Sequence, residues 1–338
     1  MSHRIGRRSW LATCAGIAAF GLTRAAVARE PGSGGPITAI VPLRDQVLVA
    51  QESSLVLRDR TTFAERTRYR LPLGKVERLI AESIDERGVR LTIVGGDPAE
   101  RGVLMQVDLI DGQWLERWRI ESSDDLLLDA VRDGEVRDGA NGAWWTAGRD
   151  ARLRRIDPNE PDSLSLLEGH SGPVTRLLSL DATRLVSASR DQSLRVWDLN
   201  SGKPVRELQQ HVGGVVDLLR TDDAGERPQV VSLGLDRTVR LWQPTIGRMV
   251  RFVRLEAPGR CLIAGAKPLS VLVPTDDGRL VTLDLEAARQ VDAIDSPSDE
   301  PTGAAIPRFT AVRDPFDGAL WLGGPFGRLD RIDTGARE

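Results

Sequence analysis

Two stretches of the chain repeat one pattern of residues at a fixed distance, and this repeat constrains the fold more than any other feature. Residues 170–198 read HSGPVTRLLSLDATRLVSASRDQSLRVWD, and residues 211–242 read HVGGVVDLLRTDDAGERPQVVSLGLDRTVRLW. In each stretch a histidine comes first, a serine lies four residues before an aspartate, and a tryptophan lies six residues after it. The two aspartates and the two tryptophans are each 45 residues apart. A period of this length indicates repeated supersecondary units in place of one unique core.

The same spacing extends along most of the chain. Residues that align with Asp198 recur seven times at separations of 41 to 49 residues, at Asp59, Asp108, Asp157, Asp198, Gln243, Asp284 and Asp333. Within one unit, the runs 184–189 and 193–198 have the composition of strands and are joined by a short polar turn, as in a β-hairpin. Helical periodicity is not sustained for more than about two turns after residue 28. We therefore expect an all-β array of seven units.

Two dipeptides in this repeat resemble signatures of the WD-repeat family of β-propellers. Gly169-His170 matches the start of the family's repeat, and Trp197-Asp198 matches the pair near the end of its third strand. The next unit keeps the histidine and the tryptophan but has glutamine at positions 210 and 243. The resemblance is specific over residues 167–252 and looser over 36–338. It implies a seven-bladed WD-repeat β-propeller with four-stranded blades.

The end of the chain raises the question of how such a ring closes. Five residues follow Asp333, which is too few for a full outermost strand, and the segment 29–35 is rich in glycine and proline. We therefore expect a seventh blade of three firm strands, whose outermost strand can be missing, closed by apolar contact with residues 37–41. The expected division of the chain is a signal peptide at 1–28, a linker at 29–35 and a β-propeller at 36–338.

In the WD-repeat family a buried network of Asp, His, Ser or Thr, and Trp ties each blade together, and the resemblance implies two such networks here. The first comprises Asp191, His170, Ser187 and Trp197, and the second comprises Asp236, His211, Ser232 and Trp242. The carboxylate can accept from one imidazole nitrogen, the other nitrogen from the hydroxyl, and the hydroxyl oxygen from the indole N–H group. We prefer Ser187 to Ser189 because the next unit has serine at the first place and Gly234 at the second.

These networks leave few residues for chemistry. His3 is the one other histidine, and Cys261 is the one cysteine after residue 28. The sequence contains no Gly-x-Ser-x-Gly turn, no phosphate-binding loop with its lysine and no haem-attachment motif. A Ser–His–Asp hydrolase would have to take a histidine from a network. We therefore predict no catalytic residue, no cofactor and no metal site.

Residues 1–28 have the order of an export signal. Arg4, Arg7 and Arg8 form a basic start, residues 11–22 are apolar, and residues 26–28 form a small-residue cleavage site. The run GRRSWL resembles the bacterial twin-arginine signal, and a general secretory signal is the alternative. The apolar run is too short to span a bilayer of roughly 30 Å. We expect a periplasmic or equivalent extracytoplasmic location and no membrane insertion after signal removal.

The expected mature chain is acidic. Removing residues 1–28 takes away four arginines and no acidic residue, which leaves 42 basic against 49 acidic residues and a formal net charge of −7. A chain of this charge lacks the positive surface that attracts phosphate backbones and anionic lipids. Nucleic acids and membrane surfaces are therefore disfavoured as partners. We expect a monomer that binds proteins.

In the WD-repeat family, partners usually dock on the face formed by the loops that lead into each blade and the turns between the second and third strands. The resemblance places Arg149, Arg190 and Leu235 on that face. The leading hypothesis is a non-catalytic, exported protein-interaction scaffold. The alternatives are an accessory subunit of an exported redox enzyme, and a propeller enzyme or small-ligand binder that uses the central channel.

Overall fold

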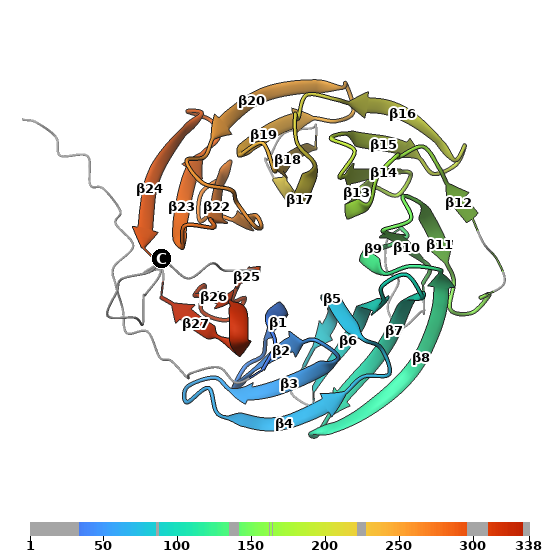
Figure 1. Ribbon diagram of the computed structural model, residues 1–338, viewed down its shortest axis with the longest axis vertical. Coiled ribbons are helices and arrows are strands. Elements are labelled where there is room, and N and C mark those ends of the chain that lie inside the picture. The colour runs from blue at the N-terminus through green and yellow to red at the C-terminus, as the bar shows by residue number, and fades with distance from the viewer. Residues whose placement is uncertain are drawn as a thin grey trace, which may run out of the picture.

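The computed structural model describes residues 34–85, 88–134, 142–161, 163, 165–221, 228–295 and 310–333. These residues form seven antiparallel sheets, each of which is one blade around a central channel (Figure 1). In the described part of the chain six sheets have four strands and one has three. Within each blade the strands run in chain order from the channel to the rim. The prediction of an all-β, seven-bladed propeller is confirmed.

The first three blades occupy the N-terminal half of the ring. Blade 1 contains β1 (Ile37–Pro42), β2 (Gln46–Gln51), β3 (Ser54–Asp59) and β4 (Glu65–Arg70). Blade 2 contains β5 (Lys75–Ile84), β6 (Gly88–Asp97), β7 (Arg101–Ile110) and β8 (Gln113–Ser123). Blade 3 contains β9 (Leu127–Arg132), β10 (Trp144–Gly148), β11 (Leu153–Ile156) and β12 (Ser165–Leu167).

The remaining four blades complete the ring. Blade 4 contains β13 (Val174–Asp181), β14 (Arg184–Ser189), β15 (Leu194–Asp198) and β16 (Lys203–Leu208). Blade 5 contains β17 (Val215–Thr221), β18 (Gln229–Gly234), β19 (Thr238–Gln243) and β20 (Arg248–Arg254). Blade 6 contains β21 (Ile263–Ala264), β22 (Ser270–Pro274), β23 (Arg279–Asp284) and β24 (Arg289–Asp295). Blade 7 contains β25 (Thr310–Arg313), β26 (Leu320–Gly323) and β27 (Leu329–Ile332), with a short 3₁₀ turn (Pro325–Gly327) before β27.

The repeat seen in the sequence marks one place in every blade. Each of the seven recurring residues lies in, at the end of, or directly after a third strand, namely β3, β7, β11, β15, β19, β23 and β27. The spacing therefore measures the distance from one third strand to the next. In the described part of the chain, no helix has the length and apolar character needed to cross a membrane.

The middle strands of each blade are the most buried. In β14 every residue after Arg184 is buried, whereas residues 203–207 of the rim strand β16 are exposed. Successive side chains of a strand point to opposite faces of the sheet, so a middle strand meets both neighbouring blades. This explains why β14 carries Leu, Val, Ala and Ser while β16 carries Lys, Arg and Glu.

Apolar clusters join each blade to the next. Trp197 of blade 4 packs in one cluster with Ala147 and Leu153 of blade 3. Trp242 of blade 5 packs in another cluster with Val196 of blade 4. Each of the two tryptophans thus packs against the preceding blade. Buried side chains of this size contribute about 3–5 kcal/mol each when compared with alanine.

Polar contacts also link neighbouring blades around the channel. The Thr38 hydroxyl of β1 donates to the Val76 carbonyl of β5 over 2.7 Å. Asp217 of β17 accepts from the Leu262 amide of blade 6 over 2.7 Å and from Arg176 Nε of blade 4 over 2.6 Å. One carboxylate therefore joins three consecutive blades.

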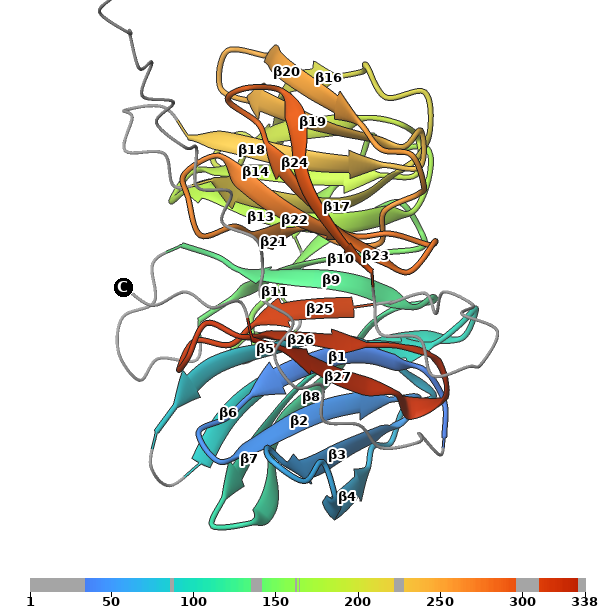
Figure 2. The same ribbon diagram turned by 90° about the vertical axis from the view of Figure 1, so that its left-hand side faces the viewer.

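Blade 7 closes the ring against blade 1 (Figure 2). Ile37 and Ile40 of β1 form one apolar cluster with Trp321 of β26 and Leu329 of β27. The Ile37 amide donates to the Gly324 carbonyl over 3.1 Å. Closure therefore runs through residues 37–41, and the three expected strands of blade 7 are present.

Several predictions concern residues outside the described ranges. The signal peptide at 1–28 and most of the linker at 29–35 belong here, and so do residues 334–338 after the last strand. That blade 7 can lack its outermost strand therefore stays a prediction, as do the domain limits.

Candidate functional site

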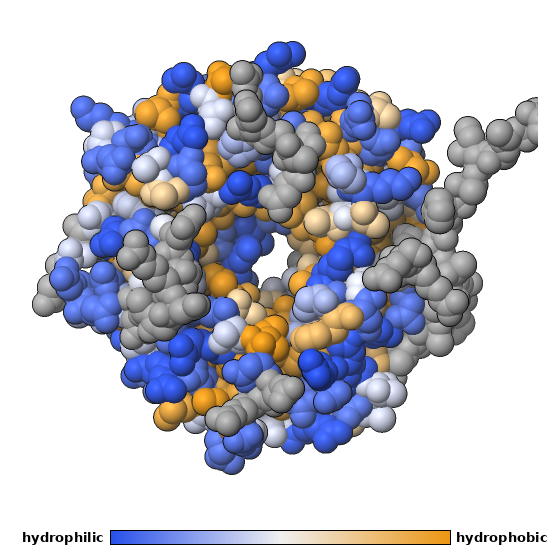
Figure 3. Space-filling model, turned by 180° about the vertical axis from the view of Figure 1, so that it is seen from behind, coloured by the Kyte–Doolittle hydropathy of each residue, from blue (hydrophilic) through white to orange (hydrophobic). Residues whose placement is uncertain are grey.

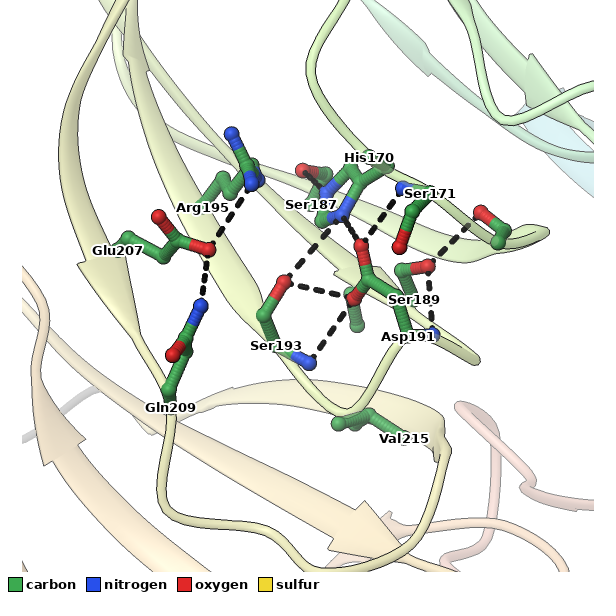
Figure 4. Close-up of polar contacts among 12 residues, drawn as sticks. His170, Ser171, Ser187, Ser189, Asp191, Ser193, Arg195, Glu207, Gln209 and Val215 are labelled. Carbon is green, nitrogen blue, oxygen red and sulfur yellow. Dashed lines mark hydrogen bonds and ion pairs between the residues drawn. The ribbon is translucent and has the colours of Figure 1, made fainter.

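Blade 4 brings His170, Ser187, Asp191 and Trp197 together from four segments of the chain. His170 lies in the loop that leads into β13, Ser187 lies on β14, Asp191 lies in the turn after β14, and Trp197 lies on β15. His170 Nδ1 is 2.7 Å from Asp191 Oδ2, and His170 Nε2 is 2.7 Å from Ser187 Oγ (Figure 4). The Trp197 indole donates to Ser187 Oγ over 2.8 Å. Because a carboxylate only accepts, Nδ1 carries the proton and Nε2 accepts from the hydroxyl.

Blade 5 contains a second quartet with the same connections. His211 Nδ1 is 2.9 Å from Asp236 Oδ2, His211 Nε2 is 2.7 Å from Ser232 Oγ, and the Trp242 indole donates to Ser232 Oγ over 2.8 Å. In both blades the imidazole and the serine are buried and the indole is fully buried. The structure thus brings together all eight residues that the sequence analysis selected, in two quartets.

Each quartet includes a second hydroxyl that the sequence analysis missed. Ser193 Oγ donates to Asp191 Oδ1 over 2.7 Å, and Thr238 Oγ1 donates to Asp236 Oδ1 over 2.7 Å. Both residues lie two positions after the aspartate, so a hydroxyl at the same place in both units was the signal. They supply the aspartate with a donor besides the imidazole.

The charges of the blade 5 quartet follow from its surroundings. Burial lowers the pKa of His211 and outweighs the opposite effect of Asp236, so the imidazole is neutral near pH 7. Burial opposes the charge of Asp236 as well, but the Thr238 hydroxyl and the facing His211 hold its pKa below the ordinary value. In blade 4, hydrogen bonds from His170 and Ser193 lower the pKa of Asp191 against the effect of burial.

The quartets have the hydrogen-bond order of a catalytic triad, but a substrate cannot reach their serines. In hydrolases an aspartate orients a histidine that activates a serine, and the serine oxygen must reach the substrate. Here Ser187 and Ser232 have no exposed surface, and each hydroxyl oxygen already accepts from an indole. Among the described residues, no three His, Cys, Asp or Glu side chains are placed to hold a metal ion. The arrangement therefore stabilises the blade and offers no reactive group to solvent.

A second set of residues takes equivalent positions on the face of the ring. In blades 3 to 6 the residue before the turn aspartate donates its backbone N–H to a carbonyl of the loop that leads into the same blade. These residues are Arg149, Arg190, Leu235 and Asp276, which bond to Leu126, Pro173, Gly214 and Pro258 over 2.8–3.1 Å. We call them the face positions.

The tight turn after each face position has the same backbone shape in all four blades. The residue after the turn aspartate has a positive φ, at Ala151, Gln192, Arg237 and Gly278. This shape is common at three-residue hairpin turns, so the four blades share one turn geometry next to the face position. The sequence analysis did not select Asp276 as a face position. The signal was the seven-residue distance from Asp277 to Asp284, which equals the distance from Asp191 to Asp198.

All four face positions line one pocket of about 790 Å³. The pocket also includes residues of the innermost strands of blades 1 to 5, such as Thr38, Glu77 and Val216, so it lies at the channel. Seen from the back of the view in Figure 1, the centre of the ring has an opening (Figure 3). We call this pocket the channel mouth. The three predicted partner-binding residues therefore converge on it.

Seven blades around a channel define a seven-bladed β-propeller, and its fourth and fifth blades each hold one buried quartet with the residues of the WD-repeat pattern. Comparison with known proteins agrees for the central blades. The family model for the WD domain, G-beta repeat, matches residues 161–198.

Curated relatives match stretches of similar extent. The nuclear distribution protein PAC1 of Arthroderma otae is 37% identical over 107 residues, which are 29% of this chain and 23% of that protein. The mitochondrial division protein 1 of Mycosarcoma maydis is 40% identical over 98 residues, 26% of this chain and 11% of that protein. The small ribosomal subunit protein RACK1 of Caenorhabditis elegans is 35% identical over 97 residues, 25% of this chain and 29% of that protein. The aligned part thus spans less than a third of each of these relatives.

Proposed function

We propose that this chain is a non-catalytic protein-interaction scaffold whose partner docks on the face around the channel mouth. The observation that carries the proposal is the convergence of Arg149, Arg190 and Leu235 from three consecutive blades on one open pocket. The histidines and serines that could perform chemistry are held in the buried quartets instead. The matched relatives are named for nuclear distribution, mitochondrial division and the small ribosomal subunit, so similar repeats occur in proteins with different tasks.

We further propose that the chain works as a monomer outside the cytoplasm. The support is the basic, apolar and small-residue order of residues 1–28, with the run GRRSWL at 6–11. A reporter protein fused behind residues 1–35 is expected to be exported. Replacing Arg7→Lys together with Arg8→Lys should keep the reporter in the cytoplasm. Undiminished export of this variant would exclude the twin-arginine route and leave the general secretory route.

Two alternative functions would use the same surface around the channel mouth. An accessory subunit of an exported redox enzyme is a scaffold whose partner is an oxidoreductase. A small-ligand binder is favoured by the volume of the channel mouth, because about 790 Å³ lies within the range of small-molecule sites. Mass spectrometry of the native protein separates the two, since a bound small molecule adds its own mass to the purified chain.

The docking face is tested with a charge-reversed variant. Arg149→Glu combined with Arg190→Glu should abolish co-purification of the partner from the exported fraction, while the thermal unfolding temperature stays unchanged. The matched control is Arg248→Glu with Arg251→Glu, which makes the same charge change on exposed residues of the rim strand β20. Partner recovery equal to wild type in the first variant would exclude this face.

A further inference from the structure

The channel mouth gathers positive charge in a chain that is acidic as a whole. Five of the described residues that line it are basic, namely Lys75, Arg149, Arg176, Arg190 and Arg260, whereas Glu77 and Asp276 are acidic. The formal net charge of the chain is −3. A recessed cluster of one sign concentrates ions of the opposite sign. The mouth therefore differs in charge from the molecule that carries it.

Three of the five cations have a carboxylate beside them. Lys75 Nζ lies 2.6 Å from Glu77 Oε1. Arg176 Nε lies 2.6 Å from Asp217 Oδ1. The Arg260 guanidinium bonds to both carboxylate oxygens of Asp276. Glu77 and Asp276, the acidic residues among the described residues that line the pocket, are therefore already paired and do not neutralise another cation.

The other two cations, Arg149 and Arg190, form no ion pair in the described part of the chain, and the carboxylate near Arg149 is that of Asp125, whose pKa is lowered by hydrogen bonds from the backbone N–H groups of Ala99 and Leu126 and by the Arg149 charge. Both are exposed toward the pocket. Arg190 also faces the like charges of Arg260 and Arg176. Together with burial, which has the largest effect, these charges lower the pKa of its guanidinium. An anion bound here would offset the like charge around Arg190 and give both guanidiniums an acceptor for charge-assisted hydrogen bonds.

The backbone holds both arginines in place before any ligand arrives. The Arg190 amide donates to the Pro173 carbonyl over 2.9 Å, and the Arg149 amide donates to the Leu126 carbonyl over 3.1 Å. The loop that leads into blade 5 runs against Arg190, because a Cβ at Gly214 would lie 2.9 Å from Arg190 Cδ. Because the backbone of both positions is already fixed, only side-chain freedom is lost on binding, which favours affinity.

An apolar strip borders the two arginines on the side of blade 5. Leu235 lies at the next face position and is 48% exposed, and Val212 in the loop that leads into blade 5 is 81% exposed. The residue after Val212, Gly213, lies against the Leu235 backbone, so the two loops are adjacent. Exposed aliphatic side chains beside a charged pocket are typical of a surface that buries a partner's apolar side chain.

We propose that the channel mouth binds an acidic segment of the partner protein, with carboxylates on Arg149 and Arg190 and an adjacent apolar side chain on Leu235 and Val212. This inference rests on the proposed scaffold function and states the chemistry of its partner. Charge complementarity selects an acidic segment, and the apolar strip selects a peptide over a small free anion. The acidity of the rest of the chain works against a nucleic acid.

The experiment measures binding of a short fluorescent peptide of consecutive glutamates followed by leucine, by fluorescence anisotropy on the full chain. The matched peptide has glutamine in place of every glutamate. We expect the acidic peptide to bind at least about tenfold more tightly than the glutamine peptide, because each charge-assisted hydrogen bond contributes a factor of about ten or more. Arg149→Gln with Arg190→Gln should remove this difference without adding negative charge. The control Arg248→Gln with Arg251→Gln on β20 should retain it.

Each other outcome overturns the inference. Equal binding of both peptides, or undiminished binding by Arg149→Gln with Arg190→Gln, would show that these arginines do not hold carboxylates. Inorganic phosphate that binds as tightly as the peptide would assign the mouth to small anions, and a single-stranded oligonucleotide that binds more tightly would assign it to nucleic acid. The scaffold function fails separately, when the charge-reversed variant loses the acidic peptide but keeps its partner from the exported fraction.

Discussion

Blade 4 and the junction between blades 7 and 1 both bury a tryptophan whose indole N–H must find a partner, and they use different residues for it. In blade 4 the Trp197 indole reaches Asp191 through Ser187 and His170, so all four residues belong to one blade. At the junction the indole of Trp321, a residue of blade 7, donates directly to Asp314 Oδ2 over 2.8 Å.

The carboxylate at the junction is shared between two blades. Arg60 of blade 1 lies 2.8 Å from Asp314 Oδ2 and 2.5 Å from Asp317 Oδ2. Phe63 of blade 1 packs against Trp321 with ring centroids 5.5 Å apart. The blade 4 quartet therefore holds one blade together, whereas the junction holds the first and last blades to each other. One arrangement serves folding of a unit, and the other serves closure of the ring.

The largest effect is expected at the junction. Asp314→Ala removes the partner of the Trp321 indole and leaves the Arg60 guanidinium, whose side chain is 14% exposed, without its buried carboxylate. Breaking a buried pair in this way costs about 3–5 kcal/mol of unfolding free energy. Urea unfolding measures the loss.

The control at the junction is Asp317→Ala. It removes the second carboxylate of the same arginine, but that side chain is 37% exposed, so the expected loss is less than about 1 kcal/mol. Similar losses for the two variants would mean that burial of Asp314 does not matter to closure.

The next effect is expected at the serines of the quartets. Ser187→Ala and Ser232→Ala each leave a buried indole N–H and a buried imidazole nitrogen without a partner, and each should cost about 2–3 kcal/mol. Ser171→Ala, an exposed serine of the same loop region, should cost less than about 0.5 kcal/mol. Combining Ser187→Ala with Trp197→Phe should cost less than the sum of the two, since both remove the same hydrogen bond. Full additivity would contradict the shared bond.

A smaller effect is expected where the two quartets differ. Blade 4 has Ser189 at the end of β14, whereas blade 5 has Gly234 at the same place in β18. A Cβ at Gly234 would lie 2.3 Å from His211 Nδ1 and 2.5 Å from Asp236 Oδ1, so Gly234→Ser should cost about 1–2 kcal/mol. The reverse change, Ser189→Gly, should cost about 1 kcal/mol through the lost bond to the Gly172 carbonyl. A stabilising Gly234→Ser would show that the two quartets are interchangeable.

The smallest effect is expected from pH. Burial lowers the pKa of His211 in the folded chain, so the unfolded chain binds more protons once the pH falls below about 6.5. Stability should therefore decline from that pH downward. His211→Gln should have a lower but flatter stability between pH 7 and pH 5, measured by urea unfolding. An unchanged slope would place the titrating group elsewhere.

The carboxylates act in a lower pH window. The pKa values of Asp191 and Asp236 are lowered in the folded chain, so their contribution is complete above about pH 4 and is lost as the pH falls further. Asp191→Asn and Asp236→Asn should each reduce the acid-induced loss of stability below that pH.

The quartets could be selected from the sequence because the resemblance to the WD-repeat family implies them and because the spacing within one repeat is local. His170, Ser187, Asp191 and Trp197 lie within one repeat, and the next repeat keeps the Ser–Asp and Asp–Trp distances, although its histidine lies four residues farther from its aspartate. The period alone also placed the third strands of blades that lack a quartet. Ser193 and Thr238 carried the same signal, a hydroxyl two residues after the aspartate in both repeats, but they were not selected.

The junction could not be predicted from the sequence. Arg60 and Asp317 are 257 residues apart, and no repeat connects them, because closure occurs once in the ring. The charge of the channel mouth was equally hidden. It depends on which side chains from six blades meet, and on which of them already hold a carboxylate.

The four face positions share one backbone hydrogen bond that does not depend on the identity of their side chains. The N–H groups of Arg149, Arg190, Leu235 and Asp276 make the same kind of bond although the four side chains are two cations, an aliphatic chain and an anion. A side chain at a face position can therefore change, one blade at a time, without loss of this bond to the loop of its blade. An engineer can make such changes, and new binding specificities on this chain would begin with substitutions at these four places.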